Sequence, residues 1–161
     1  MQLKRQAMFL DYLKVFFMSM VPVVELRGAA IYSQYLGLPV ISSFIVCIIG
    51  NMIPVPFIYY FLRKLLHFGE KFRLTGSICR WLLEKGEKAG RKHSAKGRKG
   101  MFIALVLFVG IPIPGTGAWT GTLGASILDM GIKLTSLAVV LGLIMAGTIM
   151  ITAAVLGFGI I

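Results

Sequence analysis

The sequence predicts an all-α integral membrane protein with two inverted repeats, each a re-entrant helical hairpin followed by a long transmembrane helix, joined by a basic cytoplasmic loop. Its 57% hydrophobic content and mean hydropathy of +0.85 exceed those of soluble domains. Uncharged runs cover residues 38–62, 101–128 and 134–161, and each is longer than the roughly 20 residues that span a bilayer. Two apolar segments are interrupted, at 22–28 and 110–119, and paired interruptions are typical of transporters.

The first repeat contains a re-entrant hairpin at residues 8–36 and a transmembrane helix at 38–62. Within the hairpin, we expect residues 8–21 to enter the membrane, 22–28 to turn and 29–36 to leave. Broken helices at membrane depth are tolerated where protein or a wet cavity satisfies the freed backbone groups. The turn at 22–28 is therefore the first candidate binding site.

Residues 63–100 form the predicted basic loop, which we expect to be cytoplasmic and partly interfacial. Twelve of the seventeen Lys and Arg residues lie in this range, and a short loop with such an excess stays on the cytoplasmic side. The sequence thus predicts a multi-pass protein of the plasma membrane, with anionic membrane lipids as partners of the loop. The net charge of +11 does not indicate a nucleic-acid partner, because no recognised nucleic-acid-binding fold accompanies it.

The second repeat contains a hairpin at residues 101–128 and a transmembrane helix at 134–158. The hairpin arms, 101–109 and 118–128, are each about 15 Å of helix, or half the hydrocarbon thickness. One hairpin plus one span gives each repeat an odd number of crossings, so the two halves are inverted and their hairpin tips approach at the midplane. On size grounds we also expect a homo-oligomer.

Enzymatic function and bound cofactors are not predicted. The two histidines and two cysteines are too scattered for a metal site or a disulfide framework. Glu25 is the single carboxylate at presumed membrane depth, so no pair of acid and base groups is available there.

The candidate site residues of the first interruption are Glu25, Arg27 and Gly28. A carboxyl group in a low-dielectric environment can bind a proton near neutral pH, so Glu25 is a candidate proton carrier or a contact for a cation. Arg27 can bind an anionic group through its planar guanidinium. Alternatively, a turn at 22–28 folds the two side chains together, and they neutralise each other and hydrogen-bond stranded backbone groups. These two interpretations are not exclusive.

The second interruption supplies Pro112, Pro114, Gly115, Thr116, Gly117 and Trp119 as candidate site residues. The prolines stop the helix and the glycines permit a close turn. Thr116 can cap the helix that follows, whose N-terminus attracts anions. Trp119 either packs on a ligand or fills the space between the hairpins.

Asn51 is the remaining polar candidate at membrane depth, and Pro54 and Pro56 follow it. We expect a kinked span here. Asn51 either donates a hydrogen bond to a substrate or braces the carbonyl groups that the prolines leave free.

Three motifs resemble those of a known family: Pro-x-x-Glu-Leu-Arg-Gly-Ala at 22–29, Gly-Leu-Pro at 37–39 and Phe-Val-Gly-Ile-Pro-Ile-Pro-Gly-Thr-Gly-Ala-Trp-Thr-Gly at 108–121. Over nearly its whole length the chain resembles the putative small multidrug export proteins, which are distantly similar to the DedA-like membrane proteins. The DedA-like resemblance implies two opposed re-entrant hairpins, and some DedA-like proteins recycle polyprenyl-phosphate lipid carriers. DedA-like proteins typically carry arginines in the second hairpin, whereas residues 102–128 contain none.

Three functions follow as hypotheses, and one of them is a non-transporting membrane scaffold or insertion factor that works through the basic loop. The first is a proton-coupled transporter that exports a small amphipathic or cationic compound from a site between the two hairpin tips. The alternative is a DedA-like translocase, or flippase, that moves a polyprenyl phosphate or another phospholipid carrier between leaflets, with Arg27 binding the lipid phosphate.

Overall fold

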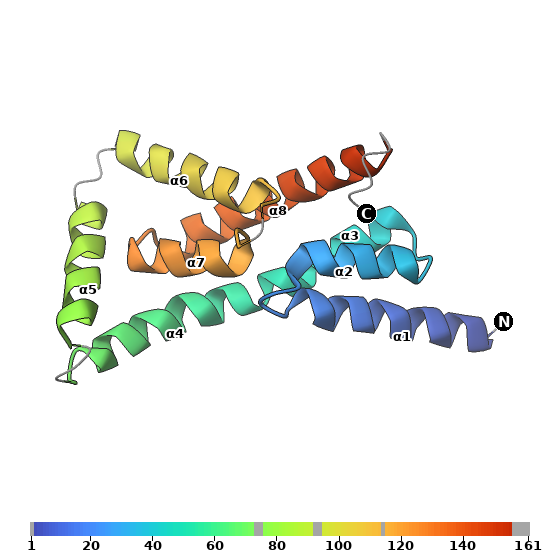
Figure 1. Cartoon of the computed structure of the whole chain (residues 1–161), viewed down its shortest axis with the longest axis horizontal. Coiled ribbons are helices and arrows are strands. Elements are labelled where there is room, and N and C mark those ends of the chain that lie inside the picture. The colour runs from blue at the N-terminus through green and yellow to red at the C-terminus, as the bar shows by residue number, and fades with distance from the viewer. Residues whose placement is uncertain (1, 73–75, 92–94, 114, 156–161) are drawn as a thin grey trace.

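The computed structural model describes residues 2–72, 76–91, 95–113 and 115–155, and the described residues form helices joined by turns. The helices are α1 (Gln2–Ser19), α2 (Glu25–Tyr35), α3 (Val40–Met52), α4 (Pro54–Gly69), α5 (Gly76–Arg91), α6 (Ala95–Gly110), α7 (Ala118–Ile127) and α8 (Ile132–Val155). All except α5 run roughly along the long axis of the molecule (Figure 1). The all-helical fold class is therefore confirmed.

The first half of the chain folds as an antiparallel pair, α1 and α2, that packs on α3 (Figure 1). The turn between α1 and α2 follows from Pro22, which has no backbone N–H to continue α1. Gly37 ends α2 with a left-handed φ of +69°, a conformation that glycine adopts without strain. Pro39 then precedes the first residue of α3, where a proline is tolerated.

Helices α3 and α4 form one bent apolar rod, Val40–Gly69, of 30 residues with a mean hydropathy of 2.0. The junction residue Ile53 keeps helical angles, φ −60° and ψ −47°, so the chain bends and does not turn back. Pro54 and Pro56 cause the bend because neither can donate the hydrogen bond to the carbonyl four residues earlier. The kinked span predicted from these prolines is confirmed.

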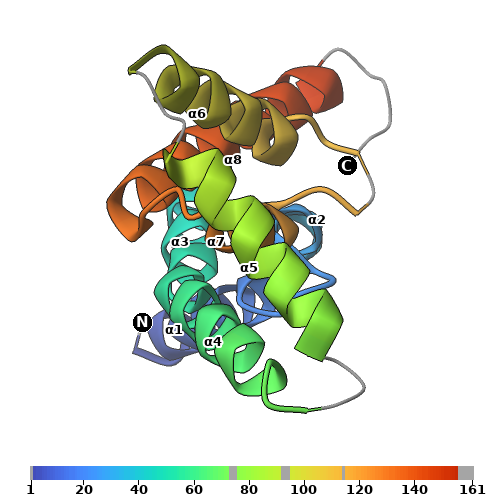
Figure 2. The same ribbon diagram turned by 90° about the vertical axis from the view of Figure 1, so that its left-hand side faces the viewer.

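Helix α5 lies across one end of the bundle (Figure 2) and connects α4 to α6. The neighbouring helices also extend beyond the apolar runs: α4 continues to Gly69 and α6 begins at Ala95. Both ends of the range 63–100 are thus helical. Residues 73–75 and 92–94, within this basic segment, lie outside the described residues.

The second half places its two antiparallel helices on different neighbours (Figure 1). Helix α6 packs chiefly on α8, whereas α7 packs chiefly on α4. Close approach of α6 and α8 depends on glycine, since a Cβ at Gly142 would lie 2.6 Å from the Val109 side chain. Helices α6 and α7 therefore splay apart beyond their shared turn.

Two rods of the described chain are long and apolar enough to cross a membrane: Val40–Gly69, and Ile132–Thr152 with 21 residues and a mean hydropathy of 2.3. They overlap the spans predicted at 38–62 and 134–158, of which residues 156–158 lie outside the described residues. Many large apolar side chains are exposed on the outer surface, among them Phe9, Ile41 and Phe57. Exposed apolar surface of this extent suits a lipid environment.

Candidate functional site

The two interrupted segments meet each other in the middle of the molecule, and Arg27 joins them. Its Nη2 atom donates to the backbone oxygen of Ile111 at 3.0 Å and to the Thr116 hydroxyl at 3.0 Å. Its Nη1 atom donates to the backbone oxygen of Ile113. Ile111 and Ile113 follow the end of α6, so their carbonyl groups have no partner within that helix. One guanidinium therefore holds the whole turn between α6 and α7.

Glu25 fastens the next element, the start of α7. The Trp119 N–H donates to its Oε1 atom at 3.0 Å. The first N–H groups of a helix have no partner within it, and the helix dipole favours an anion at that end. Glu25 therefore supplies the cap of α7 from another part of the chain, and it is 7% exposed there.

Gly117 makes this contact possible because its lack of a side chain lets the carboxylate approach the backbone. A Cβ at Gly117 would lie 1.8 Å from Oε2 of Glu25. The Glu25 backbone is itself unusual, with a φ of +47° that non-glycine residues rarely adopt. Strain of this kind persists only where the surroundings hold it, and it is concentrated at functional sites.

The positions of Glu25 and Arg27 differ from the turn expected at 22–28. Both lie in the first turn of α2, where residues two apart point in different directions. They consequently do not fold together, and no ion pair between them occurs among the described residues. Each instead binds the opposite interruption. Gly28 continues the same helix, and its N–H donates to the Val24 oxygen at 2.8 Å.

Thr116 does not cap α7, contrary to the sequence prediction. The N-cap residue is Gly117, and the Thr116 hydroxyl lies 2.8 Å from the Ile113 oxygen and 3.0 Å from the Ile111 oxygen. It therefore supports the same carbonyl groups as Arg27. Gly115 forms the turn with a φ of +86°, Pro112 is half-buried in it, and Pro114 lies outside the described residues.

Three side chains of this region have buried polar atoms without a hydrogen-bond partner among the described residues. They are both amide atoms of Asn51, the indole Nε1 of Trp119 and the hydroxyl of Thr122. Asn51 and Thr122 are 0% exposed. Asn51 therefore does not brace the carbonyls near Pro54 and Pro56. A buried unpaired polar group destabilises a fold by about 1–3 kcal/mol, so three such side chains favour a binding role over a packing role.

Helical register relates Asn51 and Thr122 along the contact of α7 with the α3–α4 rod, about one turn apart. Helices α4 and α7 run in the same direction, and Ser126 of α7 donates to the Tyr59 oxygen of α4 at 2.7 Å. One turn earlier on each helix, Val55 comes opposite Thr122; a further turn brings Asn51 to the level of Ala118. Thr122 was not predicted from the sequence, because a threonine in an apolar helix carries no signal of its own. The one sequence signal for Thr122 was its position one helical turn from both Trp119 and Ser126.

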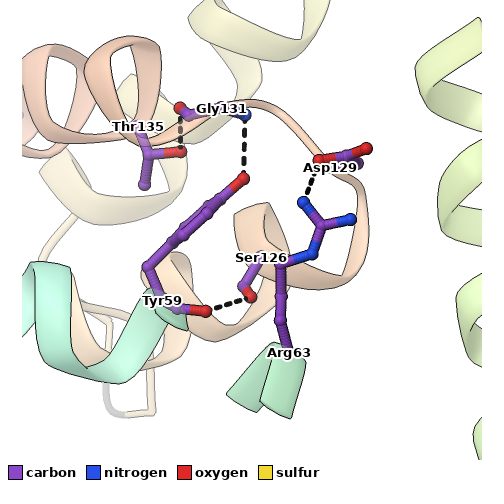
Figure 3. A network of polar contacts seen from close by, with 6 residues as sticks. All are labelled: Tyr59, Arg63, Ser126, Asp129, Gly131 and Thr135. Atoms are coloured by element: carbon purple, nitrogen blue, oxygen red, sulfur yellow. Dashed lines mark hydrogen bonds and ion pairs between the residues drawn. The ribbon is translucent and has the colours of Figure 1, made fainter. Parts of the chain in front are cut away.

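A second polar network holds the far end of α7 (Figure 3). The Tyr59 hydroxyl accepts the Gly131 N–H at 2.9 Å, and Arg63 forms an ion pair with Asp129. Thr135 donates to the Gly131 oxygen at 3.0 Å. Each of the six residues of this network has at least one hydrogen-bond or ion-pair partner in it. Helix α7 is thus fixed at both ends to the first half of the chain, which rationalises its separation from α6.

The site therefore combines one carboxylate and one guanidinium, and buried polar atoms without a partner in the described part of the chain lie on α3 and α7. No curated protein and no solved structure matches the chain. Residues 25–149 match the family described as "Putative small multi-drug export protein", and this range begins at Glu25 and includes every described residue of the site. The motifs, the apolar spans and this match together show that the chain is a membrane protein and belongs to that family.

Proposed function

We propose that the protein is a proton-coupled exporter of small amphipathic compounds, with its substrate site where the two interrupted segments meet. The observation that carries this proposal is the buried contact of the Glu25 carboxylate with the N-terminus of α7. The buried polar atoms of Asn51, Trp119 and Thr122 without a partner among the described residues support it. A cationic group can compete with the α7 amides for this carboxylate. Proton binding and substrate binding at Glu25 are then mutually exclusive, which is the basis of exchange.

The architecture of the proposal is two inverted repeats. The α1–α2 and α6–α7 pairs are re-entrant hairpins, and the bent rod α3–α4 and α8 are the full spans. The long-range contacts of Arg27 with Ile111 and Ile113 support it, because they require the tip of each pair to reach the other. In this orientation the basic segment 63–100 faces the cytoplasm.

Export requires α7 to leave the Glu25 clamp, defined here as the contacts of Glu25 and Arg27 with residues 111–119. Protonation of Glu25 removes the charge that the helix dipole attracts. The hydrogen bond from Trp119 then weakens, and the tip opens toward one side. A cationic substrate that binds the charged carboxylate competes with the same N–H, so the proton and the substrate occupy the carboxylate in turn. A ligand can only shift this equilibrium by its differential affinity for the two states.

A polyprenyl-phosphate translocase is the competing function, and two features weigh against it. Arg27 already binds two carbonyl oxygens and Thr116, and the α7 N-terminus already holds the carboxylate of Glu25. The two groups that would recognise a phosphate are therefore engaged by protein. A phosphate lipid would have to displace both.

The test is transport by purified protein in vesicles with an imposed pH gradient. In the wild type, the pH gradient is expected to drive uptake of a labelled aromatic cation against the cation's own concentration gradient. In Glu25→Gln this uptake should fall to the background of empty vesicles. Glutamine keeps the shape and the acceptor oxygen, so the variant should fold and elute as a monodisperse species. Gradient-independent movement of a short polyprenyl phosphate, retained in Glu25→Gln, would replace this proposal with the translocase.

A further inference from the structure

A cavity between the starts of α6 and α8 combines two basic residues with apolar walls. Its volume is about 310 Å³, and it is lined by Arg98, Lys99, Phe102 and Ile103 of α6 and by Leu134 and Leu137 of α8. Ile103 and Leu137 are 57% and 54% exposed, so the cavity opens on the outer surface of the bundle. The described residues of the Glu25 clamp are not among those that line it. The cavity is therefore separate from the proposed substrate site.

The two basic residues of the cavity have no ionic partner that the fold supplies. Arg98 and Lys99 are exposed, and none of the ion pairs in the described part of the chain includes either residue. Both lie in the first two turns of α6, where the helix dipole disfavours a positive charge. The described contacts therefore give these two charges no structural role, and both are accessible to an anion.

The apolar wall of the cavity continues along both helices toward their middle. On α6, the exposed Leu107 follows Ile103 by one helical turn. On α8, the exposed Leu141 and Ile144 follow Leu137 by one and two turns. The surface is thus cationic at the end of the bundle and apolar along its length. A phospholipid with an anionic headgroup has the same arrangement of charge and apolar chain.

A second copy of the chain is the other occupant that such a surface could accept, and charge argues against it. The chain has 6 acidic residues against 17 basic ones. Asp11 and Asp129 are already in ion pairs, and Glu25 binds the N-terminus of α7. A partner chain therefore offers few carboxylates to Arg98 and Lys99. The anionic lipids of the cytoplasmic leaflet, in contrast, attract basic side chains close to the membrane surface.

We propose that this cavity binds one anionic phospholipid of the cytoplasmic leaflet, with the lipid phosphate at Arg98 and Lys99 and an acyl chain along α6 and α8. In the proposed orientation this end of the bundle faces the cytoplasm, as does α5, which lies across the same end (Figure 2). The expected attraction of the basic segment to anionic lipids thereby acquires a defined site. Lipid binding here is independent of the charge on Glu25.

The test is native mass spectrometry of the purified full-length protein titrated with dioctanoyl phosphatidylglycerol, beside dioctanoyl phosphatidylcholine, which has the same chains and no net charge. The wild type should bind phosphatidylglycerol more tightly. Each cation near an anionic headgroup contributes about fivefold in affinity, so Arg98→Gln combined with Lys99→Gln should weaken phosphatidylglycerol binding about 25-fold. The matched control is Lys71→Gln combined with Arg80→Gln, which removes one lysine and one arginine from exposed positions of the same basic segment outside the cavity. This control should bind as the wild type does.

Equal losses of affinity in the two double variants would show a diffuse attraction and overturn the cavity as a site. Equal affinity of the wild type for the two lipids would also overturn it. If the variant at Arg98 and Lys99 forms a smaller oligomer while its lipid binding is unchanged, the cavity is a contact between copies of the chain and the inference is wrong. Glutamine is a good helix former and the replaced side chains are exposed, so both double variants should fold. Glu25→Gln should bind phosphatidylglycerol as the wild type does, which separates this test from that of the proposed function.

Discussion

Helix α7 is held to the first half of the chain at both ends, and the two attachments differ in how well their polar groups are satisfied. At the start of α7, Glu25 accepts the Trp119 N–H, and buried polar atoms nearby have no partner among the described residues. At its end, Tyr59 and Arg63 bind the turn after α7 and leave no polar group of that network unpaired. Fully satisfied polar networks rigidify a structure, whereas each buried polar group without a partner calls for an explanation, such as a functional role or a bound water or ion.

The two attachments also share a backbone feature. Each uses an acidic residue with a left-handed backbone, Glu25 with a φ of +47° and Asp129 with a φ of +52°. The Asp129 side chain is 36% exposed and pairs with Arg63 in partly exposed surroundings. Glu25 is 7% exposed and binds a helix N-terminus. The same left-handed backbone therefore occurs in a structural ion pair at the end of α7 and, in our proposal, in the titrating carboxylate at its start.

The largest expected effect is that of Arg27→Gln, which removes the support of the α6–α7 turn. Hydrogen bonds from a charged group are each worth about 1.5–3 kcal/mol, so loss of this side chain should lower stability by more than any change at the Tyr59 end. Arg27→Lys should recover only part, because an ammonium cannot match the planar fork that reaches three acceptors. Thermal unfolding in detergent measures both variants. An Arg27→Gln protein as stable as the wild type would show that the α6–α7 turn keeps its conformation without the Arg27 hydrogen bonds.

Comparing Gly117→Ala with Gly115→Ala distinguishes two causes of lost stability: the lost contact with the Glu25 carboxylate and the backbone strain of alanine at positive φ. Both glycines have positive φ, +156° and +86°, but only Gly117 packs on the carboxylate. Alanine at Gly115 should destabilise the fold by about 1–3 kcal/mol through strain alone. Alanine at Gly117 should destabilise it further and abolish transport. Equal losses of melting temperature in the two variants would contradict the close packing of Glu25.

Asn51→Leu should stabilise the protein and impair its function. Leucine has the same branching at Cγ and no unpaired polar atoms, so the ligand-free protein should gain about 1–3 kcal/mol. Binding of an aromatic cation should weaken in the same variant. The two measurements are a thermal melt and equilibrium binding. Destabilisation together with normal binding would identify Asn51 as a structural residue with partners in the assembled membrane protein.

Tyr59→Phe provides the matched change at the other attachment and the smallest expected effect. It removes the acceptor of the Gly131 N–H, and the expected loss is about 1 kcal/mol. Binding and transport should be unchanged, because the network at this end has no unpaired group for a ligand. Transport defects in Tyr59→Phe that exceed its loss of stability would mean that both ends of α7 take part in the cycle.

Local features of the fold could be predicted from the sequence, whereas the partners of the site residues could not. Pro54 and Pro56 predicted the bend between α3 and α4, and Pro112 and Gly115 predicted the break between α6 and α7, because these residues act through their own backbone. The choice of Ile111 and Ile113 as partners of Arg27 joins positions 84 and 86 residues apart. Such a pairing depends on the packing of whole helices, which a single sequence does not encode locally.

The cap of α7 is a second case in which the sequence did not predict the partner of a site residue. Thr116 has the side chain of a helix cap and stands just before the helix, so local rules assign it that role. Glu25 takes the position instead because its charge interacts more strongly with the helix N-terminus than a hydroxyl does. Thr116 is then free to hold the carbonyls of Ile111 and Ile113.

The most direct test of the clamp as a substrate and proton site is proton release when an aromatic cation is added to weakly buffered, purified protein. The wild type and Tyr59→Phe should release protons in proportion to the cation bound, and Glu25→Gln should release none. Undiminished proton release by Glu25→Gln, or cation binding by the wild type without any proton release, would contradict the account.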